Sequence, residues 1–218
     1  NGDVTNTRAQ RKVGDSSIKF DGTGDYLTLP YGEAADFDFG SGNFTVECWL
    51  RFDSVPGSGD TYSLLQQHTG SGSSWGGSGW SIDVEYDSGT VKHRMTFWDD
   101  GTPSWRTNIQ TWSFSADTWY HMACVRNGDV FTTYIDGTSI GATTLAYAIG
   151  DFAGTVFGFS IGTSYDNSNV AFRFFPGYMD EIRVSDSARY TTTFTPSTTE
   201  FTADANTKLL IHSNWDGG

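Results

Sequence analysis

The stretch FPGYMDEIRVSDSARY, from Phe175 to Tyr190, carries the pattern that decides the fold. Side chains along a β-strand point alternately to its two faces, so Asp180 should share a face with Ile182 and Val184. Two β-branched residues on one face are typical of a strand that packs against an apolar core. A carboxylate on such a face costs several kcal/mol unless it is paired, hydrogen-bonded or bound to a metal. The stretch therefore predicts a buried strand with a carboxylate that needs a partner.

The composition indicates one β-rich domain with an acidic surface. The chain has 218 residues, 26 of them glycine and 16% aromatic, which favours many short strands joined by tight turns. The formal net charge of −13 repels nucleic acid and anionic membranes and attracts divalent cations. No apolar run approaches the ~18 residues of a membrane span. Cys48 and Cys124 lie in expected strands, where they can form one disulfide or remain two buried thiols.

Several further stretches show the two-residue alternation of strands with one buried face. The clearest runs from Phe44 to Phe52, and similar patterns occupy residues 80–86, 91–97 and 157–161. We expect about a dozen strands in all, which is enough for two packed antiparallel sheets.

Four segments carry a family resemblance. GYMDEIRVSDSARY resembles the closing strand of laminin-G-like, concanavalin A-like jelly rolls, which reads G-x-hydrophobic-D-E-hydrophobic-R-hydrophobic. SIKFDGTGDYLTLP resembles their opening strands, and ADFDFGSGNFTVECWLRF and WYHMACVR resemble two further strands. The resemblance covers residues 15–195 and implies an all-β fold, a concanavalin A-like jelly-roll sandwich of two antiparallel sheets. We expect residues 1–14 to form an N-terminal surface segment, and residues 15–218 to form a single laminin-G-like domain with a C-terminal edge strand.

The order of the segments narrows the resemblance. NGDVTNTRAQRKVGDSSIKFDGTGDYL, followed by a jelly roll and by TKLLIHSNWDGG, is similar to modules in tail and virion proteins of marine bacteriophages. In such proteins a K-L-L-hydrophobic-H segment often opens the next copy of the module. The resemblance implies a module of a larger protein, located on a virion surface or outside the cell, with neighbouring virion subunits as partners.

Calcium is the cofactor that the resemblance implies, because the closing strand's aspartate in this superfamily often helps to hold a structural Ca²⁺. Asp180 would contribute its side chain, Asp21 would lie nearby, and a carbonyl of the turn 40–43, assigned to Gly42, would complete the shell. Acidic, glycine-rich turns supply the oxygen ligands that calcium prefers. The alternative is that Asp180 accepts backbone N–H groups and that Asp21 only stabilises its own turn.

The sequence lacks recognisable catalytic motifs. Laminarinase-like hydrolases share the jelly roll and carry E-hydrophobic-D-hydrophobic-x-E, which places two glutamates on one face of a strand. The nearest match runs from Ser81 to Glu85, where Ser81 replaces the first glutamate and the spacing is one residue short. The four histidines are isolated from nucleophile motifs, and His121 is expected to be a packed structural residue. We therefore expect no enzyme activity, and an unusual laminarinase-like glycosidase is the third alternative.

Aromatic and polar residues in the expected loops give the better functional signal. Sugars present flat C–H faces that stack on tryptophan and tyrosine, while their hydroxyls need carboxylate, amide and backbone partners. The candidate ligand-binding residues are Trp75, Trp98, Trp105, Tyr165, Asp166, Asn167 and Asn169. The resulting hypothesis is a non-catalytic, calcium-stabilised carbohydrate-recognition or adhesion module that binds a glycan or host-surface polysaccharide. In the alternative, these aromatics pack against neighbouring subunits, and the module is a structural decoration of a virion with no sugar ligand.

Overall fold

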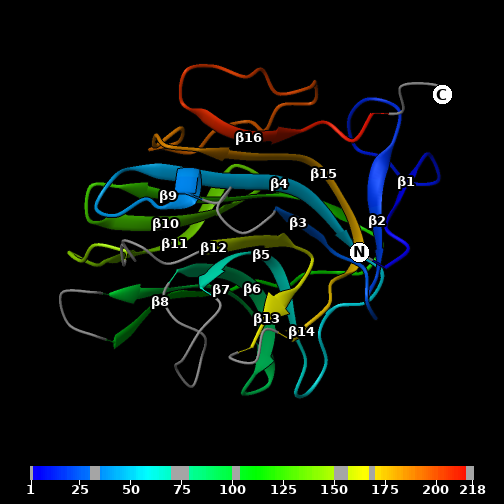
Figure 1. The fold of residues 1–218 in the computed structure, drawn as a ribbon, viewed down its shortest axis with the longest axis horizontal. Helices are drawn as coiled ribbons and strands as arrows, with labels where there is room; N and C mark the ends of the chain where they lie inside the picture. The colour runs from blue at the N-terminus through cyan, green and yellow to red at the C-terminus, as the bar shows by residue number, and fades with distance from the viewer. Residues whose placement is uncertain are drawn as a thin grey trace.

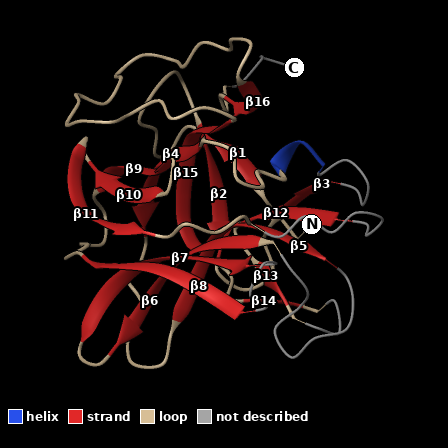
Figure 2. Ribbon diagram, turned by 90° about the vertical axis from the view of Figure 1, so that its left-hand side faces the viewer, coloured by secondary structure: helices blue, strands red, loops and turns tan. Residues whose placement is uncertain are grey.

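Two antiparallel sheets stacked on one another make up the domain (Figures 1 and 2). The computed structural model describes residues 2–29, 35–69, 79–99, 104–149, 157–166 and 170–214. The larger, eight-stranded sheet has the order β1 (Thr5–Thr7), β2 (Ser17–Asp21), β15 (Pro176–Ser185), β4 (Phe44–Phe52), β9 (Trp119–Asn127), β10 (Val130–Ile135) and β11 (Thr138–Thr144), with β16 (Thr207–Ile211) also paired to β15. The six-stranded sheet has the order β3 (Leu27–Leu29), β12 (Phe157–Ile161), β5 (Thr61–Thr69), β6 (Trp80–Asp87), β7 (Thr90–Asp99) and β8 (Ser104–Thr111). The described elements also include a small hairpin of β13 (Ser164–Tyr165) and β14 (Ala171–Phe172), and a 3₁₀ turn, η1 (Ala35–Phe37). The expected all-β sandwich of two antiparallel sheets is confirmed.

The core lies between the two sheets and follows the alternation of the sequence. In β4 the apolar members of the alternating run are fully buried; they are Phe44, Val46, Cys48, Leu50 and Phe52. They belong to one cluster with Ile82 and Val84 of β6. Phe97 of β7 stacks on Phe131 of β10 with ring centroids 4.7 Å apart, and this contact joins the two sheets directly. Removing these side chains from water is the main stabilising contribution to such a sandwich.

A bulge in β15 changes which side of the sheet its residues face. Asp180 pairs with Trp49 and Arg183 pairs with Glu47, so three steps along β15 match two steps along β4. The extra residue is accommodated at Glu181, whose φ is +49°. The prediction that Asp180 shares a face with Ile182 and Val184 is therefore wrong.

The physical reason for the bulge is a change of neighbour along one edge of β15. Residues 176–179 pair with β2, whereas residues 182–185 pair with β16. Asp180 points to the outer face of the eight-stranded sheet with Trp49, while Ile182 and Val184 stay in the core. The segment 207–211 thus completes the sheet of this domain.

The two cysteines are free, buried thiols. Burial raises the pKa of both Cys48 and Cys124 well above the usual range, so both are protonated. Cys124 Sγ lies 3.3 Å from His93 Nε2. Of the two alternatives that the sequence allows, the structure has the pair of thiols. Among the described residues there is no helix long and apolar enough to cross a membrane.

Candidate functional site

Polar side chains cover the outer face of the six-stranded sheet. The register places one hydroxyl or amide residue of each strand in a single row across the sheet: Thr28, Ser160, Gln66, Ser81, Thr96 and Thr107. All of them except Thr107 alternate with apolar residues that pack in or against the core, as Ser81 does with Trp80 and Ile82. We call the outward side chains of β6, β7 and β8 the polar face. This surface is built to form hydrogen bonds rather than to pack against apolar groups.

A charged cluster lies next to this row on the polar face. The fully buried Asp83 accepts a hydrogen bond from Ser81 Oγ at 2.9 Å and lies 3.3 Å from Nη2 of Arg94. Arg94 Nη1 also contacts Glu85 Oε2 at 2.9 Å. Arg94 thus bridges two carboxylates that are two residues apart on one strand, and the charge of Arg173 also interacts with both of them.

Three buried atoms of the polar face have no hydrogen-bond partner among the described residues. They are Asp83 Oδ1, Arg94 Nε and Thr96 Oγ1, and they belong to adjacent positions of β6 and β7. Native structures leave few buried polar atoms unsatisfied, and each one suggests an unseen partner such as water or a ligand. An acceptor, a donor and a hydroxyl side by side suit a molecule that is rich in hydroxyl groups.

An aromatic pair borders these atoms. Trp98 and Trp105 are directly opposite each other on β7 and β8, with ring centroids 5.2 Å apart and planes at 75°. The prediction that both tryptophans sit in loops is wrong, because β7 continues to Asp99 and β8 begins at Ser104. Their strand positions hold both indoles on the same face as Thr96.

The remaining candidate ligand-binding residues divide into two groups. Tyr165, in β13, donates its N–H to Gln66 Oε1 at 2.8 Å, which places it at the other side of the row from the tryptophans. Asp166 accepts the N–H of Val170 at 2.9 Å and closes its own hairpin. Trp75, Asn167 and Asn169 lie outside the described residues. Trp98 and Trp105 are therefore the candidates that the structure brings into contact with each other.

The three residues predicted to bind calcium lie apart from one another. Asp21 pairs with Pro176 at one end of β15. Gly42 precedes the start of β4, which pairs with the other end of β15. Asp180 lies between them. Within the described ranges no three His, Cys, Asp or Glu side chains are arranged to hold a metal ion. The set Asp21, Gly42 and Asp180 does not fit one calcium ion.

The carboxylates of Asp180 and Asp21 have backbone partners instead. Asp180 Oδ2 accepts the N–H groups of Lys12 at 3.0 Å and Val13 at 2.9 Å. Asp21 accepts the N–H and the hydroxyl of Thr23 at 2.7 and 2.6 Å. The geometry matches the alternative of a hydrogen-bonding Asp180 and a turn-stabilising Asp21.

The neighbouring Glu181 ties down the other end of the chain. Its Oε2 accepts the N–H of Phe201 at 2.6 Å, and its Oε1 lies 2.9 Å from Nδ1 of His212. Asp180 holds the segment before β2, and Glu181 holds the segments on both sides of β16. The adjacent carboxylates at the bulge therefore join the two terminal regions to the sheet.

We expect Asp180→Asn to stabilise the domain at pH 8 and to weaken its pH dependence. Burial raises the pKa of Asp180 from 3.8 to about 6. A raised carboxyl pKa contributes stability that is complete below about pH 4 and is lost as the pH rises through 6. A pKa shift of about two units corresponds to a change of at most roughly 3 kcal/mol in the free energy of unfolding. Asparagine keeps an oxygen for the two N–H groups and removes the charge.

The measurement is the thermal midpoint of the wild type and Asp180→Asn at pH 5 and pH 8. The gain should be larger at pH 8. Asp180→Ala, which also removes the acceptor, should be less stable than Asp180→Asn at both pH values. An equal difference between wild type and Asp180→Asn at the two pH values would contradict the raised pKa.

Comparison with known proteins identifies the family. A family model described as the concanavalin A-like lectin/glucanases superfamily matches residues 21–193. The chain belongs to this superfamily. A comparison with curated proteins finds no match.

Several solved structures resemble this chain in fold over most of its length. Tailspike protein 2 of bacteriophage CBA120, in its enzymatically active domain, matches with a TM-score of 0.62 and 14% identity over 86% of this chain and 28% of that one. Domain 4 of AbnA, an extracellular arabinanase of Geobacillus stearothermophilus, was solved in complex with arabinotriose. It matches with a TM-score of 0.57 and 15% identity, over 86% of this chain and 77% of that one. The CBM40 of a Ruminococcus gnavus IT-sialidase, bound to α2,3-sialyllactose, matches with a TM-score of 0.57 and 13% identity, over 75% of this chain and 88% of that one. At these identities the similarity concerns the fold, and this chain spans little more than a quarter of the tailspike chain.

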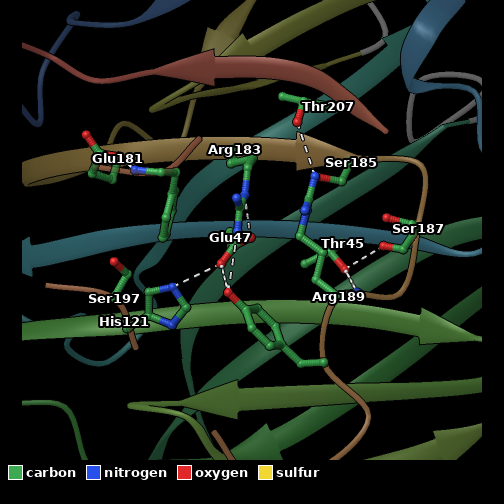
Figure 3. A network of polar contacts seen from close by, with 12 residues as sticks. Thr45, Glu47, His121, Glu181, Arg183, Ser185, Ser187, Arg189, Ser197 and Thr207 are labelled. Carbon is green, nitrogen blue, oxygen red and sulfur yellow. Dashed lines mark hydrogen bonds and ion pairs between the residues drawn. The ribbon is translucent and has the colours of Figure 1, made fainter. Parts of the chain in front are cut away.

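On the outer face of the eight-stranded sheet, this superfamily member buries a second polar cluster (Figure 3). Glu47 Oε1 accepts from Arg183 Nε at 2.8 Å, and its Oε2 accepts from Tyr190 Oη at 2.8 Å and lies 3.2 Å from His121 Nε2. Burial opposes ionisation of Glu47, but the hydrogen bond from His121 and the charge of Arg183 outweigh it, so the net pKa of Glu47 is lowered. His121 is fully buried, in agreement with its expected structural role.

The sequence analysis missed most of the residues that build these two clusters. Asp83 and Glu85 were considered only as remnants of a glycosidase motif, and Arg94 and Thr96 were not considered. The available signal was the polar half of the alternation in β6 and β7, which places these residues on one face.

Proposed function

We propose that the domain is a non-catalytic carbohydrate-recognition module that binds its glycan on the polar face. One observation carries the proposal: the unsatisfied Asp83 Oδ1, Arg94 Nε and Thr96 Oγ1 lie beside the Trp98–Trp105 pair. Sugar hydroxyls both donate and accept hydrogen bonds, and sugar C–H faces pack on indole rings. The two kinds of group that a sugar needs therefore lie side by side on one rigid sheet.

The fold neighbours support this proposal and extend it to the biological setting. The arabinanase domain and the sialidase CBM40 were solved with bound oligosaccharides. The bacteriophage tailspike shares the fold as one part of a longer chain. We infer that this module belongs to a larger virion or tail protein, at a virion surface or outside the cell, where it adheres to a host polysaccharide and contacts neighbouring subunits.

The absence of catalysis is also part of the proposal. A glycosidase of the laminarinase type needs two carboxylates that take different protonation roles at the scissile bond. On the polar face, Asp83 and Glu85 share the guanidinium of Arg94, and Ser81 stands at the position of the first glutamate. This arrangement favours binding over hydrolysis. Release of reducing ends from a polysaccharide by the purified domain would contradict it.

We expect alanine at Trp98 or Trp105 to weaken glycan binding, and alanine at both to weaken it further, while the fold stays intact. Stacking of an aromatic ring is worth roughly 0.5–1.5 kcal/mol beyond the area it buries, so loss of both rings should weaken binding by at least about tenfold. The measurement is a glycan-array screen of the wild type, followed by calorimetric titration of any hit with each variant. The matched control is Trp119→Ala, because Trp119 is a half-buried tryptophan on the eight-stranded sheet.

The outcomes separate the proposal from the structural alternative. Retained midpoints together with lost binding support a lectin-like module. A blank array, or tryptophan variants that mainly unfold the domain or disrupt assembly, would instead favour a decoration module without a sugar ligand.

Support for a calcium ion comes from the family resemblance alone, because Asp21, Gly42 and Asp180 do not come together. We propose a structural ion and test it directly, by thermal unfolding in EDTA and after calcium is restored, with elemental analysis of the untreated protein. Structural calcium requires a midpoint that falls in EDTA and recovers with calcium. An unchanged midpoint and no bound metal would show that the domain holds no structural calcium.

A further inference from the structure

A row of three buried polar side chains lies on the outer face of the eight-stranded sheet. Asp180, Trp49 and His121 are directly opposite one another on β15, β4 and β9, and none of them is more than 5% exposed. Asp180 Oδ1, Trp49 Nε1 and His121 Nδ1 each have no hydrogen-bond partner within the described part of the chain. We call these residues the Trp49 row. Three neighbouring exceptions to the usual satisfaction of buried polar atoms indicate a common missing partner.

The surroundings fix the hydrogen-bonding role of each free atom. The indole Nε1–H of Trp49 can only donate. Asp180 Oδ2 already holds two backbone N–H groups, which leaves Oδ1 as a free acceptor. His121 Nε2 faces the carboxylate of Glu47 at 3.2 Å, so Nε2 carries a proton, and Nδ1 is the ring nitrogen left to bond to a hydroxyl group. The row therefore presents an acceptor, a donor and an imidazole nitrogen, and two adjacent hydroxyl groups can bond to all three because a hydroxyl both donates and accepts.

A surface hollow lies beside the Trp49 row; the three row residues are not part of its lining, but two of its lining residues contact the ends of the row. It has a volume of about 490 Å³ and is lined by Val13, Gly14 and residues 198–202. Val13 donates its N–H to Asp180 at one end of the row. Phe201 packs edge-on against His121 at the other end, with ring centroids 6.1 Å apart. Ligand pockets typically measure roughly 300–1,000 Å³, so the hollow has room for a small molecule.

Lys12 covers the indole at the centre of the row. Its Nζ lies 4.1 Å from the centroid of the Trp49 ring, and the residue itself is exposed. An exposed cation–π contact of this kind is worth only about 0.5–1 kcal/mol. A ligand with an apolar face can therefore displace the lysine at small cost and take its place on the ring.

We propose that the Trp49 row and the adjoining hollow form a second binding site, specific for a neutral sugar or polyol with adjacent hydroxyl groups. One hydroxyl accepts from Trp49 Nε1 and donates to Asp180 Oδ1, and the next forms a hydrogen bond with His121 Nδ1. The carboxylates of Asp180 and of Glu200, in the wall of the hollow, disfavour anionic sugars. This site lies on the other sheet from the polar face and does not depend on the function proposed above.

The test follows the Trp49 indole by two-dimensional ¹H–¹⁵N NMR of the intact chain. Methyl α-D-glucopyranoside, methyl α-D-mannopyranoside, methyl β-D-galactopyranoside and glycerol are added separately, and Trp49→Phe assigns the signal. We expect a saturable shift with at least one probe. Asp180→Asn, which places an amide where Oδ1 was needed, should weaken that probe by about tenfold, the cost of one hydrogen bond. Lys12→Ala should strengthen it, because the ring is then uncovered.

Two further results separate this site from the polar face. The double variant Trp98→Ala/Trp105→Ala should leave the titration of Trp49 unchanged, whether or not the polar face binds sugar. The proposal is overturned if the Trp49 signal stays in place with all four probes, and a long-lived water detected beside the indole would then be the missing partner. It is also overturned if Asp180→Asn and the wild type titrate identically.

Discussion

Replacing Glu47 with alanine is expected to lower the free energy of unfolding by roughly 3–5 kcal/mol, the cost of breaking a buried ion pair from one side. Glu47 is the common acceptor for Arg183, His121 and Tyr190 (Figure 3). Without the carboxylate, the guanidinium of Arg183, which is only 7% exposed, loses its ion-pair partner. Chemical denaturation of the wild type and Glu47→Ala, with both slopes reported, measures the effect.

Two companion variants show whether the charge or the packing is responsible. Tyr190→Phe removes the hydrogen bond to Glu47 and the long one from Arg183 Nη2 at 3.4 Å, and it keeps the ring that stacks on Phe194, so its cost should be about 1–2 kcal/mol. Adding Arg183→Met to a Glu47→Leu background removes both charges together and should recover part of the stability lost in Glu47→Leu alone. A Glu47→Ala variant within 1 kcal/mol of the wild type would mean that water reaches the cluster and replaces the carboxylate.

The fold was predictable because its information is local and repeated. The run from Phe44 to Phe52 alternates without interruption, and alternation alone assigns each side chain to the core or the surface. Several such strands predict two packed sheets, and the resemblance of four segments to laminin-G-like domains implied the jelly-roll arrangement of those strands. The same reasoning could have assigned Ser81, Asp83 and Glu85 to one outward face.

The details of the closing strand were not predictable in this way. The bulge at Glu181 arises because β15 exchanges β2 for β16 as its neighbour, and this exchange involves segments far apart in the sequence. One added residue inverts the parity of everything beyond it, and Asp180 moved from the expected core face to the outer face. The partners of Asp180, the N–H groups of residues 12 and 13, lie 168 and 167 positions away. Strand periodicity contains no information on such contacts.

Arg126 is a comparable long-range contact that the sequence analysis included only as the last letter of a strand motif. It is 1% exposed, and its guanidinium donates to three backbone carbonyls in separate loops: Gly128 at 2.8 Å, Gly40 at 2.7 Å and Tyr147 at 2.7 Å. Burial lowers the pKa of Arg126, and no carboxylate is in direct contact with it among the described residues. Arg126 thus acts as a centre that fixes three loops by charge-assisted hydrogen bonds.

One of these loops connects Arg126 to the polar face. Tyr147, whose carbonyl Arg126 holds, packs beneath the guanidinium of Arg106 at 4.1 Å from the ring centroid. Arg106 directly follows Trp105 in β8. The strand that carries Trp105 therefore contacts, through Arg106, one of the loops that Arg126 holds.

Arg126→Met is accordingly expected to cost roughly 3 kcal/mol or more, because hydrogen bonds to a charged group contribute about 1.5–3 kcal/mol each and some carbonyls will find water instead. For a domain of this length, that loss lowers the thermal midpoint by roughly 6–12 °C. Arg126→Lys keeps the charge, but a single ammonium group cannot span three carbonyls in fixed directions. Its thermal midpoint should therefore fall between those of the wild type and Arg126→Met. Glycan titration of both variants well below their midpoints then tests the link through Tyr147 and Arg106. Affinity that falls in Arg126→Met while the domain is still folded supports that link, whereas unchanged affinity would confine Arg126 to stability.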